Sequence, residues 1–270
     1  MSKSSSFRLN PASGGHRGKM SRAKALFFML CIVAAALGCS KNPTNSEVKS
    51  SRNYYFTVTD NSSSPIANAT VQIPTSSGTY SANTTNDGKC HLSIPNSVIL
   101  PTYVVATIDN LRFMPEASSV SGESNQSTEK YIRCMSSPNR FYVRQIDLHH
   151  LGNDIYDGSA NSQLQISAQG SSISFSFYLD QAPGLMPYIR LYARGIENPT
   201  RIKINGYTTN TMGNSAANGD LSFYSFRLSG NPAQYFKSGT NILTIETAPT
   251  GLSNDPLDDI EFCALALYYN

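Results

Sequence analysis

The chain has 270 residues and a formal net charge of +3. Residues 1–38 hold six basic side chains and no acidic one, so residues 39–270 carry 15 Lys and Arg against 18 Asp and Glu. Because no basic surface remains outside the first 38 residues, the composition excludes a nucleic acid partner. The 40% hydrophobic content and the 15 tyrosines, with many Ser, Asn and Thr, predict an exported all-β protein and not a disordered chain.

The chain opens with the pattern of a secretion signal. Arg22 and Lys24 stand before an unbroken apolar run over 25–37. As a helix this run spans about 20 Å, which is shorter than the roughly 30 Å hydrocarbon core of a bilayer. A signal peptide over 1–38 therefore fits better than a transmembrane anchor, and Met20 is an alternative start of the chain.

The apolar run ends in Ala36-Leu37-Gly38-Cys39, which resembles the lipobox of bacterial lipoproteins. The resemblance implies that Cys39 becomes a lipidated N-terminus, with an ordinary cleavable signal as the alternative. Ser40 after the cysteine implies sorting to the outer membrane, so we expect a lipid anchor there. Residues 39–52 are polar and lack apolar periodicity, which predicts a flexible tether.

Short alternating strands are predicted from residue 53 on. Tyr54, Phe56 and Val58 share one face of the first strand. Further strands are predicted over 70–73, 78–84, 89–94, 103–108 and 130–134, with turns rich in Asn, Ser, Gly and Pro between them. Short strands at this spacing predict an all-β sandwich.

The sequence of residues 53–136 resembles the carboxypeptidase regulatory-like domain, a small transthyretin-like sandwich. The matching features are Asp60, Pro65-Ile66, Ala69, Val71, the turn over 85–88 and Leu92. Domains of this family are usually accessory modules of exported proteins without catalytic residues. The resemblance therefore implies a fold more than a function.

A second block of strands is predicted within residues 140–270, over 172–179, 188–194, 202–204, 221–228, 241–246 and 260–269. Asn205-Gly206 predicts a tight hairpin, because both residues tolerate a positive φ. Three segments of this block resemble galactose-binding-like jelly rolls, the fold of many carbohydrate-binding modules. They are IKINGY, FKSGTNILTIET and DDIEFCALALYY. The predicted architecture is two tandem β-sandwiches.

Three cysteines remain beyond the leader and Cys39. Cys90 and Cys134 both lie in strand-like sequence of the first block, and export favours a disulfide between them. Two unpaired buried thiols are the alternative. Cys263 lies in an apolar run and is predicted to be a free core thiol.

Catalytic motifs are missing from the sequence. Beyond the leader there are three histidines, at 91, 149 and 150, and no hydrolase elbow, zinc-protease, phosphate-loop or dinucleotide signature. Asp258 and Asp259 are adjacent, but neighbouring side chains of a strand point to opposite faces. We therefore expect no enzymatic activity.

A loop rich in oxygen ligands follows His149 and His150. The second resemblance implies a structural calcium held by an early loop and an acid before the last strand, here Asp154, Asp157 and Asp259. The alternative is a solvated turn in which Asp and Asn side chains accept hydrogen bonds from nearby backbone amides.

The second block also holds the candidate ligand residues. Tyr156 and Tyr207 are the tyrosines most expected to be exposed for stacking on a sugar ring, and Arg190 and Arg194 would bind its hydroxyls. The predicted function is a surface-anchored, non-catalytic glycan-binding lipoprotein in which the first sandwich is a spacer. The alternative is a structural or assembly lipoprotein that binds another envelope protein.

Overall fold

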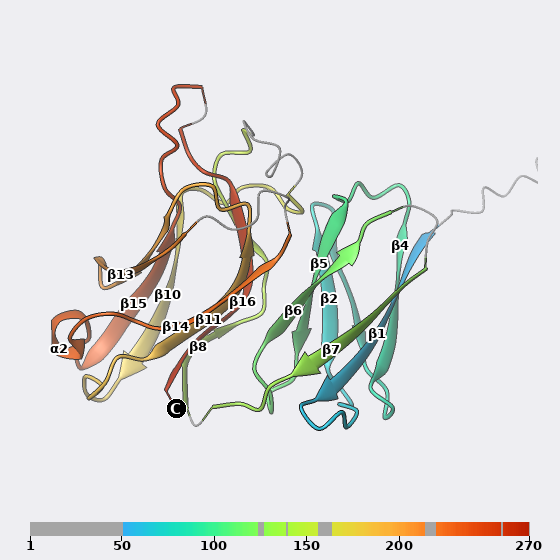
Figure 1. The fold of residues 1–270 in the computed structure, drawn as a ribbon, viewed down its shortest axis with the longest axis horizontal. Coiled ribbons are helices and arrows are strands. Elements are labelled where there is room, and N and C mark those ends of the chain that lie inside the picture. Colours follow the sequence, from blue (N-terminus) through green and yellow to red (C-terminus); the bar gives the residue numbers. More distant parts are fainter. Residues whose placement is uncertain are drawn as a thin grey trace, which may run out of the picture. The chain divides into compact units, whose positions relative to one another are not determined.

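The structure is a computed structural model that describes residues 51–123, 127–138, 140–155, 164–213, 220–254 and 256–269. These residues belong to one compact unit, and their regular secondary structure is almost entirely β-strand (Figure 1). Their single helix, α2 (Pro232–Tyr235), has four residues, and no described helix has the length and apolarity to cross a membrane. The predicted signal peptide, Cys39 and most of the predicted tether lie outside the described residues.

The first sandwich is built from two sheets with strand orders β4-β1-β7 and β3-β2-β5-β6. β1 pairs antiparallel with β4 and parallel with β7. Its alternate side chains Tyr54, Phe56 and Val58 point into the core, as the alternation predicts. The strands are β1 (Ser51–Asp60), β2 (Thr70–Thr75), β3 (Gly78–Asn83), β4 (Lys89–Pro95), β5 (Tyr103–Asp109), β6 (Glu116–Ser121) and β7 (Ser127–Cys134).

The second sandwich is built from sheets with strand orders β10-β15-β12-β13 and β14-β11-β16-β8, and β9 also pairs with β16. Its core holds Leu191, Ile202, Leu243 and Phe262, all inaccessible to solvent. The strands are β8 (Arg140–Gln145), β9 (His149–Leu151), β10 (Ser172–Leu179), β11 (Tyr188–Arg194), β12 (Thr200–Ile204), β13 (Tyr207–Met212), β14 (Ser222–Arg227), β15 (Gly239–Glu246) and β16 (Ile260–Tyr269).

The all-β sandwich prediction is confirmed, and most predicted strands match within a few residues. The predicted hairpin at Asn205 and Gly206 joins β12 to β13 with φ values of 50° and 87°. The strands β6, β8, β9 and β13 were not predicted from the sequence. It also ended the tether too late, because β1 starts at Ser51 and the buried Arg52 donates hydrogen bonds to the carbonyls of Gly122, at 3.1 Å, and Val98.

The predicted disulfide between Cys90 and Cys134 is wrong, because β1 lies between the strands that carry them. Cys90 is opposite Phe56 on one side of β1, and Cys134 is opposite Asp60 on the other side. Two strand spacings of about 4.8 Å already exceed the roughly 7 Å between Cα atoms that a disulfide spans. Both thiols are free, and burial raises the pKa of Cys90 to about 11 and of Cys134 to about 12. Cys263 is free and buried, as predicted.

The last strand, β16, is buried on both faces. One face lies in the core of the second sandwich, and the other packs against the first sandwich. A bulge at Ala264, whose φ is 50°, shifts the register against β11 and turns apolar side chains to both sides. The residues that pack between the sandwiches are Val105, Met114 and Ala117 of the first with Leu148, Cys263, Ala264, Ala266 and Tyr268 of the second.

A buried ion pair lies beside this packing. Arg194 donates to Oε2 of Glu261 from Nε at 3.0 Å and from Nη2 at 2.6 Å, and from Nη1 to the carbonyl of Tyr103 on β5 at 2.5 Å. The other carboxylate oxygen of Glu261 accepts the backbone N–H of Gln165 and, at 2.9 Å, that of Ile166. Both charged side chains are at most 2% exposed, so these contacts replace their hydration.

The side chain of Gln165 completes the sheet of the first sandwich. Paired residues of β2 and β5 end at Gln72 and Thr107, and Pro74 farther along β2 has no N–H to donate. The Gln165 amide donates to the carbonyls of Pro74 at 2.5 Å and Val105 at 3.0 Å, and it accepts the Val105 N–H at 2.7 Å. A side chain of the second sandwich thus takes the place of strand pairing in the first.

We predict that Glu261→Gln lowers the free energy of unfolding by about 3–5 kcal/mol, because it leaves the Arg194 guanidinium buried without its counter-charge. The matched control is Arg201→Met, which breaks the more exposed 2.9 Å pair with Glu246 and should cost about 0–1 kcal/mol. Chemical denaturation of both variants measures the difference. Equal losses would show that the buried pair does not hold the fold together.

Candidate functional site

An open cleft lies at one end of the second sandwich. Its volume is about 370 Å³, within the range of small-molecule sites. Two tyrosines, one arginine, one carboxylate and one amide gather there around an apolar floor. The lining residues are Arg140, Tyr142, Leu179, Asp180, Gln181, Ala182, Pro183, Gly184 and Tyr269.

Three segments far apart in the chain form this cleft. The antiparallel pairing of β8 with β16 places Arg140 opposite Tyr269. Leu179 is the last residue of β10 and is 2% exposed, so it closes the floor. The loop over 180–184 follows directly and forms the remaining wall, with the side chains of Asp180 and Gln181 exposed.

The ring of Tyr142 is fixed in the cleft wall. It stacks on Phe177 at a centroid distance of 5.9 Å and an interplanar angle of 26°. The guanidinium carbon of Arg140 lies 5.4 Å from the centroid of the same ring, which holds the cation at the cleft by a cation–π contact. Burial raises the pKa of Tyr142, and Tyr269 adds to this increase while Arg140 opposes it. The Tyr142 hydroxyl therefore stays protonated near neutral pH.

The remaining groups of the cleft suit a polyhydroxylated ligand. Among the described residues, Tyr269 has no aromatic partner, and the side chains of Asp180 and Gln181 have no hydrogen-bond partner. A half-buried ring can pack against the C–H face of a sugar. A carboxylate, an amide and the Arg140 guanidinium together supply donors and acceptors for adjacent hydroxyls.

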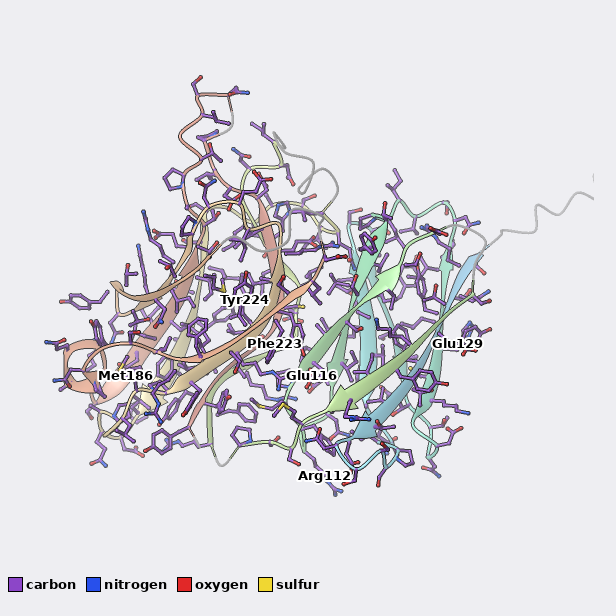
Figure 2. All side chains as sticks on the ribbon, viewed as in Figure 1. Arg112, Glu116, Glu129, Met186, Phe223 and Tyr224 are labelled. Carbon is purple, nitrogen blue, oxygen red and sulfur yellow. The ribbon has the colours of Figure 1, made fainter. Side chains whose placement is uncertain are left out.

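The predicted ligand roles of Arg190 and Arg194 are wrong, because both side chains are buried between the sandwiches. Arg190 is 3% exposed and donates from Nη2 to Glu116 of β6 at 2.5 Å, and its guanidinium carbon lies 4.8 Å from the ring centroid of Phe223. Figure 2 labels Glu116 of the first sandwich and Phe223 of the second. Tyr192 also donates to Glu116, at 2.5 Å, and burial raises the pKa of its hydroxyl. These side chains join the sandwiches and are unavailable to a ligand.

The two candidate tyrosines lie elsewhere. Tyr207 is 62% exposed, as predicted, at the β12–β13 hairpin, and its ring is 6.1 Å from that of Tyr235. It does not line the cleft. Tyr156 lies outside the described residues.

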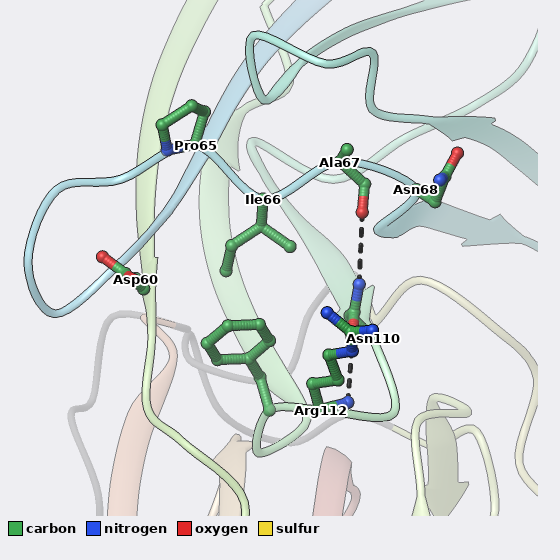
Figure 3. A pocket seen from close by; sticks show the side chains of 8 residues that line it. Asp60, Pro65, Ile66, Ala67, Asn68, Asn110 and Arg112 are labelled. Carbon is green, nitrogen blue, oxygen red and sulfur yellow. Dashed lines mark hydrogen bonds between the residues drawn. The ribbon is translucent and has the colours of Figure 1, made fainter.

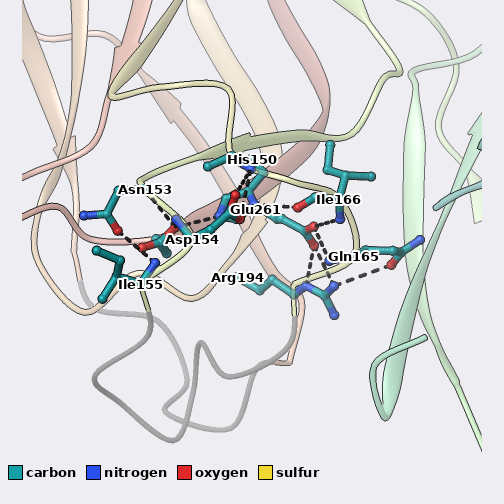
Figure 4. A network of polar contacts seen from close by, with 10 residues as sticks. His150, Asn153, Asp154, Ile155, Gln165, Ile166, Arg194 and Glu261 are labelled. Carbon is teal, nitrogen blue, oxygen red and sulfur yellow. Dashed lines mark hydrogen bonds and ion pairs between the residues drawn. The ribbon is translucent and has the colours of Figure 1, made fainter. Parts of the chain in front are cut away.

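Two of the three proposed calcium ligands, Asp154 and Asp259, belong to a polar network around His150 (Figure 4). Oδ1 of Asp259 accepts hydrogen bonds from Nε2 of His150 at 2.8 Å and from the backbone N–H groups of Asn153 at 3.1 Å and Asp154 at 3.0 Å. Gly152 precedes this turn with a φ of 146°, and a Cβ atom there would lie 2.1 Å from the same oxygen. Only glycine allows the loop to wrap the carboxylate this closely.

This donor set fits the alternative interpretation of the loop better than a calcium site. Both carboxylate oxygens of Asp154 face the N–H of Ala168, at 3.0 and 3.1 Å, and the Asn153 side chain accepts the N–H of Ile155. His150, Asp154 and Asp259 have potential ligand atoms within 4.8 Å of one another, but His150 is a hydrogen-bond donor to Asp259. Asp157 lies outside the described residues.

The surroundings of His150 favour the protonated form of its ring. Its Nδ1 faces the carbonyl of Ile166 at 2.6 Å and its Nε2 faces Asp259, so both ring nitrogens meet acceptors. Burial lowers the pKa of His150, but the hydrogen bonds and the charges of Asp259 and Glu261 outweigh it and raise the pKa overall. The protonated ring repels a second cation beside the same carboxylates.

Asp258 and Asp259 make separate contacts, although both lie just before β16 and not in a strand as predicted. Asp258 accepts the backbone N–H groups of Glu197 at 3.1 Å and Asn198 at 2.9 Å, away from the contacts of Asp259, and burial raises its pKa to about 6. His149 packs against Phe175 and Phe262, and burial lowers its pKa.

None of the residues that line the cleft was predicted from the sequence to be a ligand-binding residue. The turn composition of Asp180–Gly184 was a visible signal for a loop, and Tyr142 and Tyr269 were visible as tyrosines near strand ends. Nothing in the local sequence indicated that these segments meet, because β8 was not predicted as a strand.

Comparisons with known proteins give structural similarities alone. No family model and no curated protein sequence matches the chain. Solved structures include the Bacillus anthracis TIE protein (8% identity, 72% of this chain, 31% of that chain, TM-score 0.26) and a Bacteroides plebeius β-porphyranase of glycoside hydrolase family 86 (16%, 76%, 30%, TM-score 0.23). A third, from Bacteroides uniformis, is described as a "putative carbohydrate binding protein" (10%, 81%, 99%, TM-score 0.23). The chain spans about a third of the first two proteins.

The two adjacent histidines should contribute to stability with opposite pH dependence. The raised pKa of His150 means that its stabilisation is full below the ordinary value of 6.5 and is lost as the pH rises through the folded-state pKa. The lowered pKa of His149 means that its contribution is full above 6.5 and is lost as the pH falls through the folded-state pKa.

Unfolding free energies measured from pH 5 to 9 test this prediction. His150→Gln should remove part of the loss on alkalinisation, and the matched variant His149→Gln should remove part of the loss on acidification. NMR titration should place His150 above 6.5 and His149 below it. A His150 resonance that titrates below 6.5 would contradict the raised pKa of this residue.

Proposed function

We propose that the chain is a lipid-anchored surface protein whose second sandwich binds glycan without catalysis. The observation that supports this most is the cleft in which Tyr269, whose ring stacks on no other ring among the described residues, lies with the polar side chains of Arg140, Asp180 and Gln181. This combination of one open aromatic face and several hydrogen-bonding side chains matches what a sugar offers. The cleft replaces Arg190 and Arg194 as the ligand site of the sequence-based hypothesis.

The lining of the cleft favours binding over hydrolysis. Glycoside hydrolysis usually needs two carboxylates on either side of the scissile bond. Asp180 is the one acidic residue among the nine that line the cleft. Binding is expected to be weak, because each hydroxyl exchanges water for a protein hydrogen bond with a net gain on the order of 1 kcal/mol.

The anchoring part of the proposal rests on the sequence before residue 51. A lipid on Cys39 would attach the chain to the outer membrane through the segment that leads into β1. Both sandwiches would then be displayed together, because their buried contacts join them.

A glycan array probed with the purified protein tests the binding function. Tyr269→Ala and Asp180→Asn should each lower the affinity for the glycans that bind by about tenfold, since each removes roughly 1.4 kcal/mol of contact. Their melting temperatures should stay near that of the unmodified protein, because Tyr269 is half-buried and Asp180 is exposed.

Two exposed tyrosines serve as matched controls. Tyr131→Ala, on the first sandwich, should leave glycan binding unchanged. Tyr207→Ala separates the cleft from the site suggested by sequence: loss of binding in this variant with none in Tyr269→Ala would move the site to the hairpin. A folded protein without any glycan partner that captures an envelope protein would favour the assembly function instead.

The lipid anchor has its own test. Cys39→Ala should abolish palmitate labelling and detergent partitioning, because no other residue of the lipobox offers a thiol to the acyl chain. The variant should stay folded, since Cys39 precedes the sandwiches. Continued fractionation of Cys39→Ala with the outer membrane would contradict lipidation.

A further inference from the structure

A second pocket lies in the first sandwich, away from the glycan cleft. Its volume is about 490 Å³, and it opens between the loop over 60–68 and the turn over 109–113 (Figure 3). An apolar surface and four polar side chains share its lining. The lining residues are Asp60, Pro65, Ile66, Ala67, Asn68, Asn110, Arg112 and Phe113.

The first wall of this pocket is held by the loop's own hydrogen bonds. Oδ1 of Asp60 accepts the backbone N–H groups of Ser62 at 2.8 Å and Ser64 at 2.9 Å. The backbone N–H of Ile66 donates to the carbonyl of Val58 at 3.0 Å, which joins the end of the loop to β1. The side chain of Ile66 is 5% exposed, so it forms a fixed apolar surface.

The second wall is tied to the first. The Asn110 side chain accepts the N–H of Arg112 at 3.0 Å and donates to the carbonyl of Ala67 at 3.3 Å, across the pocket from its own turn. The carbonyl of Arg112 accepts the N–H of Ser137 at 3.1 Å. The pocket therefore exists before any ligand arrives, which lowers the ordering cost of binding.

Opposite charges at this pocket have no ion-pair partner in the described part of the chain. The Arg112 guanidinium is exposed and makes no ion pair or hydrogen bond there, and the second carboxylate oxygen of Asp60 accepts none. Figure 3 shows Asp60 and Arg112 at opposite sides, with Ile66 between them. An acidic, an apolar and a basic side chain thus line the pocket.

We propose that this pocket binds an extended peptide segment in which an apolar residue lies between a basic and an acidic one. The basic group would pair with Asp60, the apolar side chain would pack on Ile66, Pro65 and Phe113, and the carboxylate would pair with Arg112. A neutral sugar offers no charge for either end, and a nucleic acid would meet repulsion from Asp60. Charge complementarity therefore favours peptide over both.

Fluorescence anisotropy with short labelled peptides tests this proposal on the purified protein. The probes are acetyl-Lys-Leu-Glu-amide and acetyl-Glu-Leu-Lys-amide, which cover both chain directions, with acetyl-Gln-Leu-Gln-amide as the uncharged control. One or both charged probes should bind at least tenfold more tightly than the control, and added salt should weaken this binding.

Charge changes at the two ends provide the decisive variants. Arg112→Glu should lower the affinity for the charged probes at least tenfold and create binding of acetyl-Lys-Leu-Lys-amide. Asp60→Asn keeps an oxygen for the Ser62 and Ser64 amides and should weaken the same probes without a change in melting temperature. Tyr269→Ala in the glycan cleft should leave peptide binding unchanged.

Three results would overturn the proposal. They are equal binding of the charged and uncharged probes, an unchanged preference in Arg112→Glu, and displacement of the peptide by a mixture of neutral sugars. Because Tyr269 and Asp180 are not part of this pocket, failure here leaves the glycan proposal standing, and failure of glycan binding leaves the peptide proposal standing.

Discussion

The fold depends on a charge pair that neither sandwich can satisfy alone. Arg194 and Glu261 belong to the second sandwich, yet the guanidinium needs the Tyr103 carbonyl of the first to complete its hydrogen bonds. In return, the Gln165 side chain pairs with backbone groups that Pro74 leaves without a partner strand. Removing either sandwich would expose these side chains to water and abolish the hydrogen bonds that cross from one sandwich to the other. The two sandwiches therefore form one structural unit and are not independent domains joined by a linker.

This packing decides where ligands can bind. The outer face of the sheet that contains β11 and β16 is covered by β5 and β6 of the first sandwich, and the ion pair between Arg190 and Glu116 lies in this contact. Open pockets are left to loops and strand ends, where side chains from distant segments meet without having to fill a core. The cleft at Asp180 and Tyr269 and the pocket at Asp60 and Arg112 are both of this kind.

Sequence patterns predicted what depends on local burial and failed where a distant surface intervenes. The alternation of Tyr54, Phe56 and Val58 and the positive φ at Asn205-Gly206 are local properties, and both were predicted correctly. Arg190 and Arg194 alternate with core residues and so appear solvent-facing, but another sandwich covers that face. Strand order is also invisible locally, which is why Cys90 and Cys134 seemed able to pair although β1 separates them. The cleft was missed because it needs the unpredicted strand β8.

The parallel pairing of β1 and β7 determines how the molecule carries load. The chain before β1 would lead to the membrane, and the chain after Cys134 leads into the second sandwich at Arg140. β1 and β7 run in the same direction over their paired length. Tension between the chain before β1 and the chain after β7 therefore acts parallel to the two strands. The hydrogen bonds between β1 and β7 are then loaded in shear at the same time and do not break one after another. Tension on the second sandwich is therefore resisted by several hydrogen bonds of the first sandwich at once.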